Sequence, residues 1–220
     1  MIKKLKIALI FILTVICCVC SASCTTQRSG DFTSADLTDS ESYKLTPCED
    51  VSDGELADAA DKLRERLKHL GLKDNQYKIS VAGREITAEL PKDLCSETAL
   101  SYLFSQSELT FRAYDNTTLL TNGSIKHAKA GEDQDGNPIV VLEFTAESQK
   151  TFASLTEKVA SYEDCRLYIY LGDFLLSKPY VFGKIDSLNY HIVNIGTAQD
   201  AKIIATVIEC GPLPIELKMI

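Results

Sequence analysis

Apolar residues recur every three or four positions between residues 53 and 70, which is typical of the buried face of a helix. These positions are Leu56, Ala60, Leu63, Leu67 and Leu70. Ser52 and Glu55 form a capping-box pattern ahead of them, and Gly71 marks the end of the helix. The basic residues of the segment fall on the remaining positions, within one turn of acidic partners: Lys62, Arg64, Arg66 and Lys68. We therefore expect the basic run to be a solvated helix face.

The next segment alternates with period two and predicts a hairpin. "YKISV" and "EITAEL" flank a turn at Gly83, and Pro91 ends the second strand. A second helix is expected over residues 96–105, followed by a strand at "ELTFRAY". With "SYKLT" as the first strand, the order is β-α-β-β-α-β, which predicts a ferredoxin-like base over residues 42–115.

The polar stretch from residue 115 to 138 contains the turn signals "NG" and "DQDGNP", and we place a domain boundary there. A second α+β series follows over residues 116–220. Its expected helices begin after Thr145 and at Thr197, which pairs with Asp200 as a cap. Its expected strands are "IVVLEF", "RLYIYL", "FLLSKPYVF", "YHIVNI" and "IELKMI". The fold class predicted for the whole chain is α+β with mostly antiparallel sheets.

Residues 1–23 have the order of a bacterial export signal: three lysines, an apolar run over residues 7–20, and small residues before Cys24. The run is shorter than the roughly 20 residues of a membrane-spanning helix, so cleavage is favoured over an uncleaved anchor. We predict that Cys24 is lipidated and that residues 24–41 form a polar tether. Ordinary signal cleavage, with Cys24 as a spare thiol, stays open. In either case the protein is expected to work outside the cytoplasm. With Cys24 lipidated, it is expected to be lipid-anchored to the bacterial cytoplasmic membrane or cell surface.

The formal net charge of −8 becomes −11 once the three lysines of residues 1–23 are removed. An acidic surface argues against nucleic acid and other polyanionic partners. The glycines are scattered singly at turns and form no phosphate-binding loop, so no nucleotide is expected either.

The sequence contains no readable metal or catalytic motif, and we predict a protein that is not an enzyme, with no cofactor and no metal. The four cysteines of the globular part are far apart in the sequence, and we expect them to be largely unpaired within each half: Cys48, Cys95, Cys165 and Cys210. His69, His127 and His191 have no second ligand at metal-binding spacing. A catalytic site assembled from distant residues remains an alternative.

Tyrosines are concentrated in the second half of the chain. Tyr168 and Tyr170 alternate onto one face of a strand, and with Tyr180 and Tyr190 they are candidate contacts for an extended peptide. The alternative is that these rings pack beneath the covering helices.

Several segments, taken in order, resemble the first large extracytoplasmic domain of SecD, a subunit of the bacterial protein-export complex SecDF. They are "LADAADKLRERLKHLGL", "REITAELP", "SELTFRAYD", "GNPIVVLEFTAESQKTFASLTEKV", "LYIYLGDFLLSKPYVFGKI" and "TAQDAKIIATVIECGPLPIEL". The resemblance implies a ferredoxin-like base with a head inserted above it, and a head that holds emerging unfolded polypeptide. The family's glycine-rich "GLDLxGG" segment is absent, and no transmembrane bundle follows, so a proton-driven motor is not expected in this chain alone.

The sequence therefore predicts a binding module whose partner is unfolded polypeptide or a membrane protein of the export machinery. Binding is expected through the half from about Ile125 to Gly211. A structural surface lipoprotein without a client is the remaining alternative.

Overall fold

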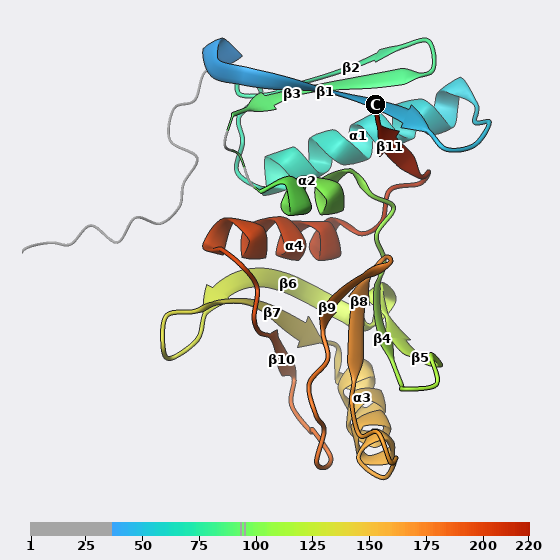
Figure 1. The fold of residues 1–220 in the computed structure, drawn as a ribbon, viewed down its shortest axis with the longest axis vertical. Helices are drawn as coiled ribbons and strands as arrows, with labels where there is room; N and C mark the ends of the chain where they lie inside the picture. Colours follow the sequence, from blue (N-terminus) through green and yellow to red (C-terminus); the bar gives the residue numbers. More distant parts are fainter. Residues whose placement is uncertain (1–36, 93, 95) are drawn as a thin grey trace, which may run out of the picture.

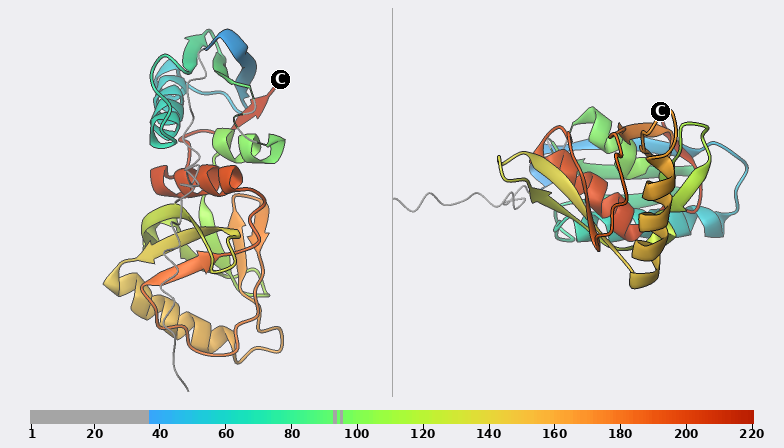
Figure 2. Two further views of the ribbon diagram at one scale, coloured as in Figure 1. Left: turned by 90° about the vertical axis from the view of Figure 1, so that its left-hand side faces the viewer. Right: turned by 90° about the horizontal axis from the view of Figure 1, so that it is seen from below.

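A computed structural model describes residues 37–92, 94 and 96–220 of the chain. Two bodies are stacked along the long axis, with a single helix between them (Figures 1 and 2). We call the body that contains the C-terminus the base, and the other the head. The signal, the Cys24 lipidation and Cys95 lie outside the described residues.

The base is one antiparallel sheet of order β11-β1-β3-β2, covered on one face by two helices (Figure 1). Its strands are β1 (Ser40–Pro47), β2 (Lys78–Ala82), β3 (Glu85–Pro91) and β11 (Leu217–Met219), preceded by the 3-10 turn η1 (Leu37–Asp39). Its helices are α1 (Asp53–His69), which begins with the expected capping box, and α2 (Glu97–Phe104). This strand order is that of a ferredoxin-like sheet, with β11 as its fourth strand.

The head contains two antiparallel sheets and the helix α3 (Ala146–Val159). One sheet has the order β10-β7-β6, from β6 (Ile125–Glu132), β7 (Pro138–Phe144) and β10 (Asn189–Ile192). The other has the order β5-β4-β8-β9, from β4 (Leu109–Arg112), β5 (Thr118–Thr121), β8 (Tyr168–Leu171) and β9 (Phe174–Ser177). The turn η2 (Asn122–Ser124) joins β5 to β6. The predicted class, α+β with antiparallel sheets, is confirmed.

The expectation that "ELTFRAY" completes the base sheet is wrong. This segment forms β4, which pairs with β5 and β8 in the head, and "IELKMI" returns to pair with β1 in the base. The polar stretch after residue 115 also forms two strands, β5 and β6. A boundary at residue 115 therefore cuts through a head sheet. Alternation along a strand predicts its faces but not its neighbours, so the partner of β4 could not be read from the sequence.

The helix α4 (Ala198–Cys210) lies between base and head (Figures 1 and 2). It packs on α1 and α2 on one side and on β6 and β7 on the other. Its buried residues run almost continuously from Ala201 to Ile208, as expected for a helix enclosed by protein. Base, α4 and head consequently share one hydrophobic core.

Arg66 of α1 corrects the expectation that the whole basic run is solvated, because its side chain is fully buried. Its guanidinium donates to the carbonyl oxygens of Leu103 at 2.6 Å, Ser105 at 3.1 Å and Gly211 at 2.6 Å. Position 66 is three residues after Leu63 and four before Leu70, so it borders the apolar stripe of α1. Ser105 and Gly211 lie where the chain passes from base to head and back again.

Candidate functional site

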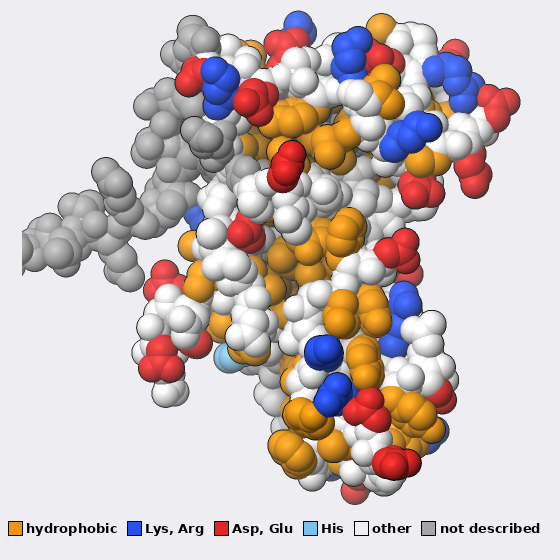
Figure 3. Space-filling model, viewed as in Figure 1, with side chains coloured by type: hydrophobic (Ala, Val, Ile, Leu, Met, Phe, Trp, Pro, Cys, Tyr) orange, Lys and Arg blue, Asp and Glu red, His pale blue; other side chains and the backbone are white. Residues whose placement is uncertain are grey.

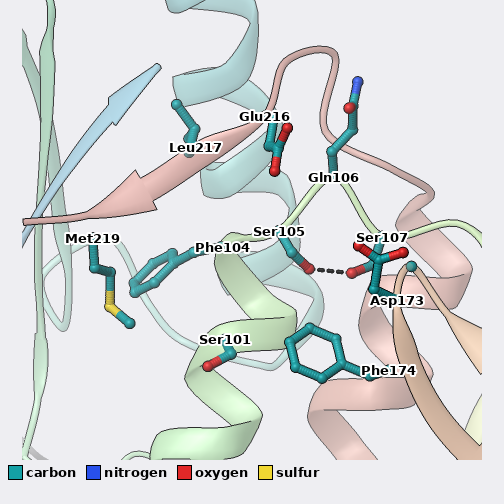
Figure 4. Close-up of a pocket in the computed structure, with 11 residues that line it drawn as sticks. Ser101, Phe104, Ser105, Gln106, Ser107, Asp173, Phe174, Glu216, Leu217 and Met219 are labelled. Atoms are coloured by element: carbon teal, nitrogen blue, oxygen red, sulfur yellow. Dashed lines mark hydrogen bonds between the residues drawn. The ribbon is translucent and has the colours of Figure 1, made fainter. Parts of the chain in front are cut away.

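Three depressions follow one another along β9, on the side of the molecule where base and head meet. The first has a volume of about 460 Å³ and lies between α2, the β8–β9 turn and β11. Phe104, Phe174 and Met219 supply its apolar surface, and Asp173 and Glu216 its carboxylates (Figure 4). The hydroxyls of Ser105 and Ser107 are hydrogen-bonded to each other in its wall (Figure 4).

The second and third depressions share Leu175 and Leu176 of β9 and have volumes of about 320 Å³ and 340 Å³. The opposite wall is formed by residues 193–196, which connect β10 to α4. The ring of Phe174 meets that of Tyr102 edge to face at 4.9 Å, so an aromatic pair stands between the first and second depressions. We call the three depressions together the β9 groove.

Exposed apolar side chains accompany this groove. Phe174 and Leu175 are 40% and 42% exposed, and Phe182, beyond the end of β9, is 87% exposed. The rings of Phe182 and Tyr180 are stacked, with centroids 5.9 Å apart, and the Arg166 guanidinium lies over Tyr180 at 4.6 Å. Figure 3 shows hydrophobic side chains gathered near the waist of the molecule and on the lower part of the head.

The four tyrosines singled out from the sequence do not form one site. Tyr168 and Tyr170 lie on the same face of β8, as expected, but Tyr168 donates to Asp164 at 2.8 Å and Tyr170 lies beneath the Arg112 guanidinium. Tyr180 is 55% exposed. Their use as peptide contacts stays a prediction.

Tyr190 belongs to the core of the head. Its ring packs edge to face on Phe111 and Phe152, and burial raises the pKa of its hydroxyl to about 12. Here the packing alternative holds, because α3 covers this part of β10. The residues that sequence reasoning missed are Phe174, Leu175 and Phe182. Phe174 and Leu175 have the consecutive apolar pattern of an ordinary buried strand, and it is the position of β9 at a sheet edge that exposes them, whereas Phe182 lies in the segment after β9.

No cluster of three or more metal-ligating side chains occurs among the described residues. His127 contacts Glu209 at 3.1 Å, and Glu209 also accepts from the main chain of Ala128, so this histidine is held in a structural contact between β6 and α4. The described cysteines, Cys48, Cys165 and Cys210, are all free. Within the described part of the chain no helix is long and apolar enough to cross a membrane.

Residues 100–215 match the family model of the SecDF P1 head subdomain. The matched range begins in α2 and includes β4, in agreement with the sheet to which β4 belongs.

Over 176 residues, or 80% of the chain, the sequence is 30% identical to protein translocase subunit SecD of Acidaminococcus fermentans. Over 172 residues, or 78%, it is 28% identical to SecD of Dictyoglomus turgidum. The chain spans about two fifths of the length of these two proteins, 41% and 42%.

Two solved structures share the fold at 24% identity over 81% of the chain. One is SecDF in a super-membrane-facing form, with a TM-score of 0.62 over 29% of its length. The other is a chain of SecDF, described as a membrane component that enhances protein export, with a TM-score of 0.59 over 97% of its length.

Proposed function

Because the chain belongs to the SecDF P1 head family, we propose that it is an extracytoplasmic binding module that holds unfolded polypeptide during protein export. The observation that carries the proposal is the set of four exposed apolar side chains on β9 and shortly after it, of which the first two line the β9 groove: Phe174, Leu175, Tyr180 and Phe182. Large apolar side chains gathered on a protein surface mark an interaction site. Aromatic rings supply contact area at a small cost in conformational entropy.

The chemistry of the groove suits a polypeptide better than a small metabolite. Its walls combine apolar rings, hydroxyls, main chain and three carboxylates, those of Asp173, Glu216 and Asp200, and it is drawn from both the base and the head. Binding of this kind is tolerant of sequence and modest in strength. We expect dissociation constants between about 1 μM and 1 mM, which correspond to roughly 8 and 4 kcal/mol.

The test uses the whole globular chain, from residue 37, because a fragment from Ile125 to Gly211 lacks β4 and the α2 and β11 sides of the groove. A labelled protein that is kept unfolded by reduction and carboxymethylation is titrated in the absence of nucleotide. We expect binding, and suppression of aggregation of a second, heat-denatured protein.

Matched variants locate the surface. Tyr180→Ser combined with Phe182→Ser removes two exposed rings of the head and should weaken binding about tenfold. Val81→Ser removes a side chain that is 41% exposed on β2 of the base, and should leave binding unchanged. Equal loss in both variants, or no binding by the unaltered chain up to about 1 mM, would leave docking on an export membrane protein or a clientless scaffold as the surviving function.

The attachment to the membrane is a separate proposal, and its support is the sequence order ahead of Cys24. We propose that Cys24 becomes the acylated N-terminus after cleavage. Mass spectrometry of the mature N-terminus should find a lipidated cysteine, and Cys24→Ala should release the protein from membranes. An unmodified N-terminus at another residue would contradict this proposal.

A further inference from the structure

The strand β9 has one unpaired edge, and the segment that follows a second edge strand, β10, lies across a depression from β9. β9 is the last strand of the sheet β5-β4-β8-β9, and β10 is the end strand of the sheet β10-β7-β6. Leu175 and Leu176 of β9 and residues 193–194, directly after β10, line the same depression of about 340 Å³. An edge strand presents a row of N–H and C=O groups without partners. The open edge of β9 and the residues directly after the edge strand β10 therefore border one depression.

The geometry of the β8–β9 hairpin decides which main-chain N–H and C=O groups of β9 point toward this depression. The turn contains only Gly172 and Asp173, with Leu171 opposite Phe174, and Gly172 has φ 59°. This is the pattern of a two-residue turn with glycine at its first central position. The closing pair of such a turn exchanges main-chain hydrogen bonds, and the next pair does not. The N–H and C=O of Leu175, in that next pair, therefore point away from β8 toward the open edge.

Charges of opposite sign stand at the two ends of β9. Asp173 directly precedes the strand and lines the first depression together with Glu216, whereas Lys178 directly follows the strand and lines the third. Within the described part of the chain, no ion pair engages any of these three side chains. Asp200 lines the second depression, so the groove is acidic in its first two depressions, nearer the base, and basic in the third.

From these contacts we infer that the client is bound as an added strand between β9 and β10. The segment that fits is extended and carries apolar side chains at alternating positions. At the end nearer the base it has a lysine or arginine, opposite Asp173 and Glu216. The inference rests on the proposed function and adds the binding mode. Main-chain hydrogen bonds to Leu175 supply affinity for almost any sequence, and alternate side chains enter the depressions beside Leu175 and Tyr102.

The first test separates main chain from side chain at one position. Leu175→Pro removes the outward N–H and places a ring on the edge, whereas Leu175→Val keeps the N–H and an apolar side chain. Proline is tolerated in an edge strand where its nitrogen has no partner. Against the labelled unfolded reporter, we expect at least tenfold weaker binding by Leu175→Pro and less than threefold by Leu175→Val, with the melting temperature of both close to that of the unaltered chain. Equal binding by both variants overturns the inference.

Hydrogen exchange gives a readout that does not depend on any variant. In the unaltered chain, saturating reporter should slow exchange of the Leu175 amide, whereas the amide of Val81 on the edge strand β2 of the base should not change. An unprotected Leu175 amide in the bound state overturns strand addition even if Leu175→Pro fails to fold.

A pair of synthetic peptides tests the charge preference. Both carry the same alternating apolar core, one flanked by lysines and the other by glutamates. We expect the lysine peptide to bind about threefold or more tightly at low salt, and the preference to vanish in Asp173→Asn combined with Glu216→Gln. Equal binding of the two peptides overturns the inference that the bound segment carries a lysine or arginine opposite Asp173 and Glu216. If the unaltered chain binds neither reporter nor peptide, the proposed function itself fails. If it binds and Leu175→Pro binds equally well, only strand addition fails.

Discussion

The chain passes between base and head twice, after α2 and after α4, and the side chain of Arg66 contacts both of these segments. Its guanidinium reaches the carbonyls at the C-terminal ends of α2 and α4, where the helix dipole favours a positive charge. Burial nevertheless opposes the charge and lowers the pKa of the guanidinium to about 10. The fold keeps this charge because three carbonyl oxygens that are partly or wholly out of water would otherwise lose their donor.

Replacing Arg66 with methionine should destabilise the chain by about 3 kcal/mol, because buried carbonyls without a donor cost about 1–3 kcal/mol each and water can reach some of them. Urea unfolding followed by circular dichroism measures this. Lys68→Met on the same helix is the control, since Lys68 is 59% exposed and forms only a surface ion pair with Asp74. Its effect should stay within about 0.5 kcal/mol. Equal effects of the two variants would contradict the role of Arg66.

Cys210, the last residue of α4, predicts a dependence of stability on alkaline pH. Burial, with a further contribution from Glu65, raises the pKa of its thiol to about 11 from 9.0. The folded state therefore holds the thiol proton more tightly than the unfolded state. The stability contributed is complete below about pH 9 and is lost as pH rises toward 11.

Between pH 9 and 11, Cys210→Ala should lose stability less steeply than the unaltered chain, as measured by urea unfolding at each pH. Cys48→Ala is the matched control, since Cys48 is exposed. Parallel pH profiles for all three proteins would show that the Cys210 thiol is not protonated preferentially in the folded state.

Among the elements, α4 depends on a cap that it shares with α2. One oxygen of Asp200 accepts from the main chain and hydroxyl of Thr197, and the other accepts from the Ser96 hydroxyl at 2.7 Å. Thr197 and Ser96 are the N-cap residues of α4 and α2. Burial on its own would raise the pKa of Asp200, but the hydrogen bonds from Ser96 and Thr197 outweigh it and lower that pKa. A single carboxylate therefore fixes the starts of two helices relative to each other.

Asp200→Ala should cost about 1–2 kcal/mol of stability at neutral pH, the range found for loss of a helix cap. Because the folded pKa is lowered, the stabilisation is present above about pH 4 and is lost as pH falls further. The difference from the unaltered chain should therefore shrink in acid. Glu157→Ala, on the exposed side of α3, should change stability little at any pH. A difference that persists in acid would assign the loss to packing instead of the carboxylate.

At the scale of the whole molecule, base and head are closed by segments from distant parts of the sequence. The base sheet needs β11 from the C-terminal end of the chain. The head sheet β5-β4-β8-β9 needs β4, which lies before the expected domain boundary at residue 115. With α4 packed on both bodies, the hydrophobic core is continuous. We expect one cooperative unfolding transition, with far-ultraviolet circular dichroism and tyrosine fluorescence changing together.

A fragment comparison tests this organisation. Residues 125–211 lack β4, the inner strand that lies between β5 and β8, and should give a poorly dispersed NMR spectrum. Residues 106–212 retain all the strands of both head sheets and should give a better dispersed spectrum. A well-folded 125–211 fragment would show that β4 is dispensable to the head.

The sequence by itself determined most of the individual elements of this protein, although not the strands β5 and β6. The spacing of Leu56, Leu63 and Leu67, the caps at Ser52 and Thr197, and the alternation around Gly83 encode local geometry within a few residues, and the structure agrees with them. Only the tertiary structure decided which sheet β4 and β11 join, that Arg66 is buried, and that the side chain of Leu175 is exposed while the ring of Tyr190 is packed on Phe111 and Phe152. These properties depend on neighbours that are distant in the sequence, from 37 residues away for Leu103 beside Arg66 to 145 for Gly211. A local pattern specifies which face of an element is apolar, but the element that covers that face, or leaves it open to a client, is chosen by packing of the whole chain.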